Sequence, residues 1–95
     1  MHVISRKKLK EAAEQHGDLE GPLDVWFRIV KRAAWRTLDD VRKTFASADV
    51  VQKWTVFNIK GNRYRLITEI NYRFQRVYVR DVLTHAEYDQ EKWKQ

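Results

Sequence analysis

The sequence predicts a single α+β domain in two layers, with two N-terminal helices packed on one face of a small, mostly antiparallel sheet and a short C-terminal helix. Two observations predict this class. Apolar residues recur at helical spacing before position 35, and β-branched and aromatic residues gather in three runs after position 53. Because a chain of 95 residues has room for little more than one core, residues 1–95 are expected to fold as one domain.

The N-terminal part is predicted to form a short strand followed by two helices. Residues 3–4 form the strand, and Ser5 is expected to cap a helix that runs to about His16. Gly21 and Pro22 open the second helix, because proline is tolerated in the first helical turn. Apolar side chains at i, i+3, i+4, i+7 and i+11 give this helix the strongest amphipathic pattern in the chain: Leu23, Trp26, Phe27, Val30 and Ala34.

The remainder of the chain is predicted to form a short helix, three strands and a final helix. Thr37 resembles an N-cap followed by acids, and residues 46–52 are expected to form a loop. Thr84 begins the last helix, expected to reach about Trp93, because Glu87 stands at capping-box spacing. Three strands form an antiparallel meander between these helices: residues 53–59, 63–71 and 76–83.

Alternation along the strands predicts which side chains share a face. On the middle strand one face is expected to carry Arg63, Arg65, Ile67 and Glu69. On the last strand one face is expected to carry Arg76, Tyr78, Arg80 and Val82. If the two helices cover one side of the sheet, the arginines should lie on the other side or at its rim.

Positive charge is concentrated in the strand region. Residues 52–80 hold seven basic side chains and one acid, so this third of the chain accounts for the whole net charge of +6. A concentrated patch of this kind attracts a polyanion, and arginines interleaved with aromatic side chains suit a nucleic acid. The alternative is a solvated sheet face that contributes only solubility.

Composition excludes several classes of site. The chain has no cysteine, which rules out a disulfide framework, a thiolate metal site and a cysteine nucleophile. Its three histidines lack the paired spacing of a metal site, and no glycine-rich phosphate loop is present, so neither a metal nor a cofactor is expected. Without a long apolar run, the protein is expected to be cytoplasmic and not membrane-bound.

Three segments resemble the HigB family of toxin–antitoxin systems. Residues 1–9, MHVISRKKL, resemble the family's M-H-hydrophobic-I start. Residues 57–66, FNIKGNRYRL, resemble its F-N-x-x-G-N-x-x-R-[LV] hairpin, and residues 79–89, VRDVLTHAEYD, resemble its closing V-x-x-[VI]-x-T-H-x-E-Y-D block. The order and spacing match over nearly the full chain, and the closing block is the most specific of the three.

The resemblance implies a RelE-like fold and cleavage of messenger RNA, which in many family members takes place on the ribosome. It further implies neutralisation by a helix-turn-helix antitoxin of the HigA type, with operator DNA contacted only through the antitoxin complex. The motif covers four residues that carry chemistry in the hairpin and the closing block: Asn62, Arg65, His85 and Tyr88.

Metal-free RNA cleavage uses the substrate's 2′-hydroxyl to attack the adjacent phosphorus, so it needs a base, an acid and cations near the phosphoryl oxygens. Histidine exchanges protons near neutral pH, and Tyr88 follows His85 by three residues on the same side of the predicted helix. Arg65 and Arg80, on neighbouring strands, are candidates for holding the scissile phosphate. With His85 and Tyr88 they form the candidate catalytic set. The candidates for binding the rest of the RNA are Lys53, Lys60, Asn62, Arg63 and Arg76.

Each candidate also has a structural interpretation. Arg65 and Arg80 could form salt bridges to Glu69 or Asp81, and Tyr88 could anchor the last helix to the sheet. His85 could be a surface residue beside a cap, Asn62 a turn residue, and Lys53 and Lys60 rest on charge and location alone. Two other functions stay open: a nucleic-acid-binding module without catalysis, and a RelE-fold protein-interaction module that has lost activity.

Overall fold

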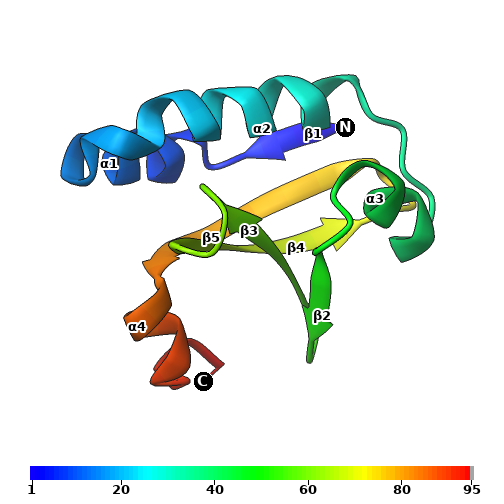
Figure 1. Ribbon diagram of the computed structural model, residues 1–95. Coiled ribbons are helices and arrows are strands. Elements are labelled where there is room, and N and C mark those ends of the chain that lie inside the picture. The colour runs from blue at the N-terminus through cyan, green and yellow to red at the C-terminus, as the bar shows by residue number, and fades with distance from the viewer. Residues whose placement is uncertain (95) are drawn as a thin grey trace.

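A five-stranded sheet forms the centre of the protein, in a computed structural model that describes residues 1–94. The strand order is β1-β5-β4-β3-β2, and β2 to β5 form an antiparallel meander, whereas β1 pairs with β5 in parallel. Figure 1 shows the sheet beneath the two N-terminal helices. The strands are β1 (His2–Ile4), β2 (Asp49–Val51), β3 (Trp54–Ile59), β4 (Tyr64–Asn71) and β5 (Arg76–Thr84).

The helices lie on both sides of this sheet. Two of them, α1 and α2, cover one face, and α4 projects from the opposite side near the C-terminus (Figure 1). We call the face turned away from α1 and α2 the open face. The helices are α1 (Arg6–Gln15), α2 (Glu20–Arg32), α3 (Leu38–Thr44) and α4 (His85–Asp89), with 3-10 turns η1 (Gly17–Leu19) and η2 (Lys92–Lys94). The predicted two-layer α+β class is confirmed.

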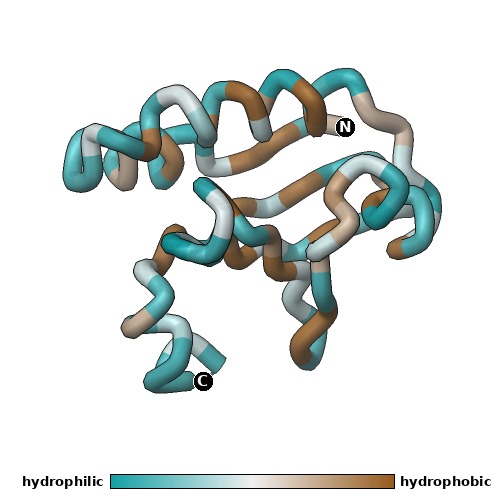
Figure 2. Tube along the Cα trace, in the orientation of Figure 1, coloured by the Kyte–Doolittle hydropathy of each residue, from teal (hydrophilic) through white to brown (hydrophobic). Residues whose placement is uncertain are grey.

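The main core lies between α1, α2 and the sheet. Hydrophobic and hydrophilic stretches alternate along the coils of both helices (Figure 2), as the amphipathic pattern predicts. Trp26 of α2 meets Phe57 of β3 edge to face, with 5.5 Å between ring centroids. Leu66 of β4 and Val77 of β5 are also fully buried in this cluster. This core fixes α1 and α2 on one face and leaves the other available.

A second, smaller core lies on the open face. It consists of Trp54, Val56, Ile67 and Trp93, with Val51, Leu83 and Tyr88 packed against it. Trp93 comes from the last turn of the described chain, so the C-terminal segment folds back across part of the open face. The sheet is therefore covered on one side by two helices and on the other only by this short segment.

The last helix ends earlier than predicted. It stops at Asp89 rather than near Trp93, because Glu91 adopts a left-handed backbone conformation with φ 62°. Trp93 then lies in η2, where its indole N–H donates to the Tyr88 carbonyl at 2.9 Å. The start of α4 agrees with the prediction, since Thr84 and Glu87 form both hydrogen bonds of a capping box.

Two predictions from the sequence are wrong: the Ser5 side-chain cap and the loop at residues 46–52. Ser5 occupies the N-cap position of α1, but its φ of 75° directs the chain so that its carbonyl, not its hydroxyl, accepts from the Lys8 N–H. The segment 46–52, expected to be a loop, contains strand β2. This strand is three residues long and largely exposed, and it is defined by pairing with β3 rather than by its own pattern.

A β-bulge in the middle of β5 changes which of its alternate side chains face the main core. The register shifts between Ile67 and Thr68 of β4, which leaves Arg80 as an extra residue in β5. Val79 lies in the main core before the bulge, and Val82 packs against the same core after it. The predicted common face of residues 76, 78, 80 and 82 is therefore wrong for Val82, because the bulge shifts the alternation by one residue.

Candidate functional site

The candidate site lies where β4 begins and β5 passes into α4. Thr84, the last residue of β5, pairs with Tyr64 at the start of β4. The His85 backbone N–H donates to the Arg63 carbonyl at 2.9 Å, which ties the first residue of α4 to the preceding turn. Together with the capping box, these bonds set the position and direction of a helix only five residues long. The site is therefore built on paired strands, with α4 fixed at their end.

His85 is held by a carboxylate one helical turn later. Its Nδ1 lies 2.9 Å from Oδ2 of Asp89, and the histidine side chain is 44% exposed. A neutral imidazole that donates from Nδ1 to a carboxylate presents Nε2 as a proton acceptor. The contact thus engages Nδ1 with Asp89 and leaves Nε2 outside this interaction.

Arg65 is almost buried, yet its guanidinium is bonded only to neutral acceptors. The side chain is 9% exposed, and its N–H groups donate to the Asn62 carbonyl at 3.1 Å, the Asn62 side-chain oxygen, and the Tyr64 carbonyl at 3.2 Å. Within residues 1–94 it forms no ion pair, so the suggested bridge to Glu69 or Asp81 is not present. Its positive charge is left without a carboxylate, which favours an anionic ligand.

Tyr88 joins Arg65 to the C-terminal segment. The Arg65 guanidinium carbon lies 5.3 Å from the centroid of the Tyr88 ring, and that ring also stacks on Trp93 at 4.9 Å and 17°. The hydroxyl forms no hydrogen bond with any described residue. These contacts support the anchoring role that the sequence left open, and they also place the phenol beside the unneutralised cation.

A second group of cations surrounds Trp54 on the open face. Arg80 lies over the Trp54 ring at 4.4 Å, and Lys53 lies 4.6 Å from the same ring centroid. Lys53 is also within 3.8 Å of Glu69, an exposed ion pair. Trp54 is therefore a platform for two of the predicted site residues, on strands that neighbour β4.

Of the predicted RNA-binding residues, Lys60 is engaged elsewhere, Arg76 lies far from Arg65, and Arg63 is exposed near it. The Lys60 ammonium bonds to Asp18 at 2.9 Å, and that carboxylate also accepts from the Tyr64 hydroxyl at 3.1 Å, on the side of the main core. Arg76 stands at the other end of β5. Arg63 is exposed, and its side chain makes no hydrogen bond or ion pair with any residue the structure describes.

The pKa values of Asp18 and Tyr64 are both shifted in this cluster, and Lys60 acts on that of Asp18. The hydrogen bond from Lys60 lowers the pKa of Asp18, against an opposing effect of burial. Burial, followed by the hydrogen bond to Asp18, raises the pKa of Tyr64. Lys60 therefore links the turn between β3 and β4 to η1 through its bond to Asp18.

Sequence reasoning missed Trp54 and Trp93 and singled out no role for Asp89. Trp54 directly follows Lys53 at the start of a strand, so the cation–aromatic alternation could have indicated it. Trp93 follows Tyr88 by five residues, a spacing that places them apart on a regular helix and gives no signal. Only the break at Glu91 brings the two rings together.

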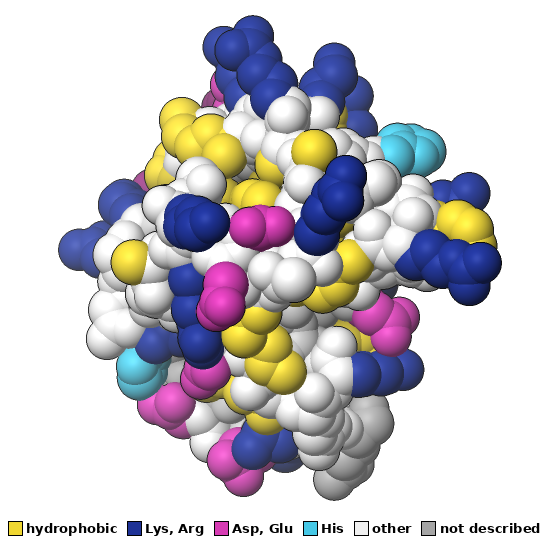
Figure 3. Space-filling view, turned by 90° about the vertical axis from the view of Figure 1, so that its right-hand side faces the viewer, with side chains coloured by type: hydrophobic (Ala, Val, Ile, Leu, Met, Phe, Trp, Pro, Cys, Tyr) yellow, Lys and Arg dark blue, Asp and Glu magenta, His cyan; other side chains and the backbone are white. Residues whose placement is uncertain are grey.

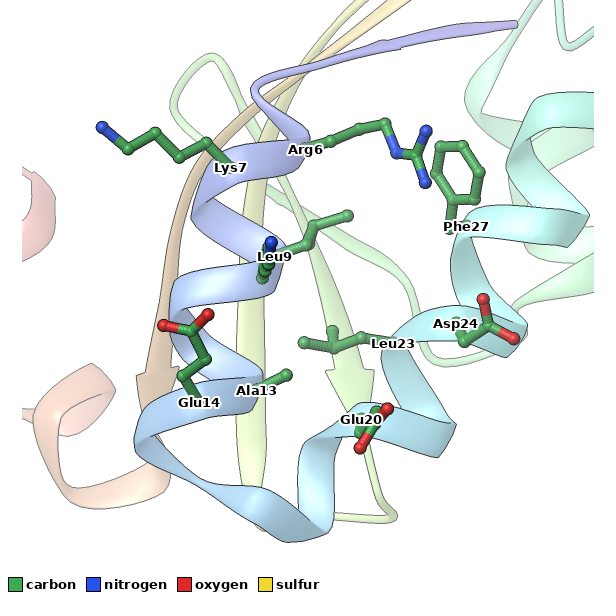
Figure 4. Close-up of a pocket in the computed structure, with 10 residues that line it drawn as sticks. Arg6, Lys7, Leu9, Ala13, Glu14, Glu20, Leu23, Asp24 and Phe27 are labelled. Atoms are coloured by element: carbon green, nitrogen blue, oxygen red, sulfur yellow. The ribbon is translucent and has the colours of Figure 1, made fainter.

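A groove in the surface lies away from the candidate site. A groove of about 580 Å³ runs between α1 and α2 on the opposite side of the protein (Figure 4). It has an apolar floor that includes Leu9 and Leu23, and both signs of charge line its walls. In residues 1–94 no three His, Cys, Asp or Glu side chains gather as metal ligands, and no helix is long and apolar enough to cross a membrane.

The two-layer α+β architecture, with Arg65 beside Tyr88 and with His85 at the junction of β5 and α4, is consistent with a RelE-like domain. Residues 19–91 match the HigB toxin family, described as a RelE-like toxic component of a toxin–antitoxin system. The chain is 32% identical over 92 residues to the mRNA interferase toxin HigB of Escherichia coli (strain K12) and to the mRNA interferase HigB of Shigella flexneri. These matches cover 94% of this chain and 88% of each relative.

The chain therefore belongs to the HigB toxin family, as its hairpin and closing block predict. As the toxic component of a two-part system, it has an antitoxin as its counterpart. The family match includes the start of β4, all of β5 and α4, so it covers every residue of the candidate site.

Proposed function

We propose that this protein is an endoribonuclease that cleaves messenger RNA without a metal, by attack of the substrate's 2′-hydroxyl on the adjacent phosphorus. The names of its relatives as mRNA interferases support the substrate class. One observation of the structure carries the site assignment: Arg65 is nearly buried, bonded only to neutral acceptors, and adjacent to Tyr88 of α4. A fixed, unneutralised guanidinium suits the developing charge on a phosphoryl group.

In the proposed mechanism His85 and Tyr88 exchange the two protons and the arginines hold the phosphate. Nε2 of His85 accepts the proton of the 2′-hydroxyl, or returns one to the leaving 5′-oxygen, while Asp89 fixes the ring. Tyr88 takes the complementary role or stacks on a flanking base. Arg65 contacts the scissile phosphate, and Arg80 on the Trp54 platform contacts the same phosphate or the next one. Proton transfer by such a positioned group contributes roughly 10²–10⁴-fold.

The remaining candidates bind the RNA backbone. We propose that Arg63 and Lys53 contact phosphates near the site, which is supported by the exposure of Arg63 beside α4 and by the position of Lys53 on the Trp54 ring. Asn62 is committed to Arg65 and therefore supports that side chain. Arg76 extends the cations along β5, and we rank Lys60 last because its ammonium already bonds to Asp18.

The proposed partners follow the family. We propose a helix-turn-helix antitoxin of the HigA type as the inhibitor, messenger RNA on the ribosome as the substrate, and a cytoplasmic site of action. Operator DNA would be bound only through the toxin–antitoxin complex. An antitoxin that bound the open face would compete with RNA, whereas one bound to the helix layer would block docking on the ribosome.

Induced expression tests the function and the site together. Wild type, Arg65→Ala, His85→Gln and the control Arg36→Ala, an exposed arginine before α3, are expressed without antitoxin, with folding checked by circular dichroism. We expect growth arrest and cleaved transcripts with 2′,3′-cyclic phosphate ends for wild type and the control, and loss of both for the other two. Equal toxicity in all four refutes the site assignment. A folded wild type that neither arrests growth nor cleaves RNA refutes the function.

A further inference from the structure

The turn between β4 and β5 presents an exposed phenylalanine at the end of the sheet opposite α4. Phe74 is 60% exposed, more than either of the other exposed large hydrophobic side chains in residues 1–94, Val25 and Val50. β5 runs from this turn to the candidate site over nine residues, a span of roughly 30 Å at about 3.3 Å per residue. Phe74 therefore lies too far from His85 to contact the same nucleotide.

Phe74 is held outward by a well-bonded turn. Its backbone N–H donates to the Asn71 side-chain oxygen at 3.0 Å. The Gln75 side-chain amide donates to the Tyr72 carbonyl at 2.8 Å and to the Trp35 carbonyl at 2.7 Å, and the Gln75 backbone is left-handed with φ 57°. The exposure of the ring is thus a fixed feature of the turn.

Cations surround the ring from both layers. The guanidinium carbons of Arg73 and Arg76 lie 5.4 and 5.8 Å from the Phe74 centroid. A hollow of about 610 Å³ beside the ring also receives Arg6 and Lys31, and none of the carboxylates in residues 1–94 lines it. Figure 3 shows Lys and Arg side chains projecting at the top of the view, where the helix layer lies. The groove between α1 and α2, by contrast, includes Glu14, Glu20 and Asp24 among its walls (Figure 4).

The open face connects this turn to the candidate site. Arg76 lies 3.5 Å from the Tyr78 hydroxyl, and Tyr78 pairs with Glu69 on the open face of β4. Arg80 follows on the same face, over Trp54. A strand of RNA leaving the site along β5 would meet alternate cationic and aromatic side chains before it reached Phe74.

We propose that Arg73, Phe74 and Arg76, the turn patch, form a second RNA-contact site, which takes an unpaired base on the Phe74 ring and the adjoining phosphates on the two guanidiniums. An aromatic ring flanked by guanidiniums matches a base and its phosphates, because bases stack on flat side chains while arginine binds phosphate oxygens. The proposal rests on the proposed endoribonuclease function and adds a contact that governs affinity for long RNA, separate from the chemistry.

Binding of RNAs of two lengths tests the turn patch. Fluorescence anisotropy is measured in the full-length His85→Gln background with labelled single-stranded RNAs of about 4 and about 20 nucleotides, with and without Phe74→Ala. Stacking of one base predicts that Phe74→Ala weakens binding of the long RNA about five-fold or more and leaves the short RNA unchanged. Phe74→Trp should restore binding, and Val25→Ala, an equally exposed apolar control on α2, should not alter it.

The outcomes separate this proposal from the proposed function. Equal affinity of Phe74→Ala and its parent for the long RNA overturns the turn patch, as does an equal loss for both lengths. Loss of antitoxin binding with unchanged RNA binding also overturns it and assigns the patch to an acidic protein partner. Absence of cleavage by the wild type would refute the nuclease function but would leave the length-dependent binding result intact.

Discussion

Nδ1 of His85 lies 2.9 Å from Oδ2 of Asp89, so a residue of the same short helix holds the imidazole ring in position. Asp89→Asn keeps the shape of the side chain and removes its charge. We expect kcat for RNA cleavage to fall about two- to five-fold, the effect of one exposed ion pair, with KM unchanged. His85→Gln should cost roughly 100-fold or more.

A double-mutant cycle distinguishes positioning from a general structural effect. In the His85→Gln background, Asp89→Asn should cause no further loss, because the carboxylate then has no imidazole to orient. An equal, additive loss in both backgrounds would mean that Asp89 acts independently of His85.

Arg65 should not tolerate lysine. Lysine preserves the charge but cannot reach both the Asn62 and Tyr64 acceptors with one planar group, so Arg65→Lys leaves buried acceptors unpaired. We expect a loss of about 1–3 kcal/mol in the free energy of unfolding and at least a ten-fold fall in kcat. Urea unfolding and cleavage assays measure the two effects. Wild-type activity in a folded Arg65→Lys protein would contradict the assigned role.

The stability of the smaller core should depend on Trp93. Trp93 is 7% exposed, stacked on Tyr88 and packed with Trp54, so Trp93→Ala should reduce the free energy of unfolding by about 3 kcal/mol. Trp93→Phe should lose less than half of that amount, because a ring remains to stack. Chemical denaturation gives the values, and a change below about 0.5 kcal/mol for Trp93→Ala would show that η2 contributes little to the fold.

The Lys60–Asp18 pair predicts a pH-dependent difference in stability. Because the Lys60 hydrogen bond lowers the pKa of Asp18, the pair stabilises the folded state above the usual carboxyl range near pH 4 and loses this effect as pH falls through the lowered pKa. Lys60→Met should therefore melt at a lower temperature than wild type at pH 7, with the difference closing in strong acid. A difference that persisted unchanged at pH 2 would exclude this pair as its source.

The elements with their own periodic or capping signal could be predicted from the sequence. α2 has apolar residues at helical spacing, the meander consists of β-branched and aromatic runs, and Thr84 with Glu87 marks the start of α4. β2 could not be predicted in this way, because its three residues are a strand only by virtue of pairing with β3. The left-handed residue Glu91 carries no signal that distinguishes it from a helical glutamate.

The sequence predicted which residues belong to the candidate site, but only part of how their side chains are arranged in space. Sequence alternation placed Arg65 on the open face, but could not show that its bonds go to a turn and a tyrosine ring instead of to a carboxylate. The bulge at Arg80 depends on register between two strands and is invisible within either one. Lys60 is one of the basic residues of the segment 52–80. Its ion-pair partner, Asp18, lies 42 residues earlier in the chain, so nothing in the sequence indicated that this charge is neutralised.

The parallel pairing of β1 with β5 has a consequence for how the protein is made. Val3 finds its sheet neighbour only at Val77, so the β1 edge of the sheet cannot form until residue 77 has been made. Contacts this distant in sequence form late and slow the search for the native state. The β1 edge of the sheet and α4 at the candidate site are therefore both completed only after most of residues 1–94 have been made.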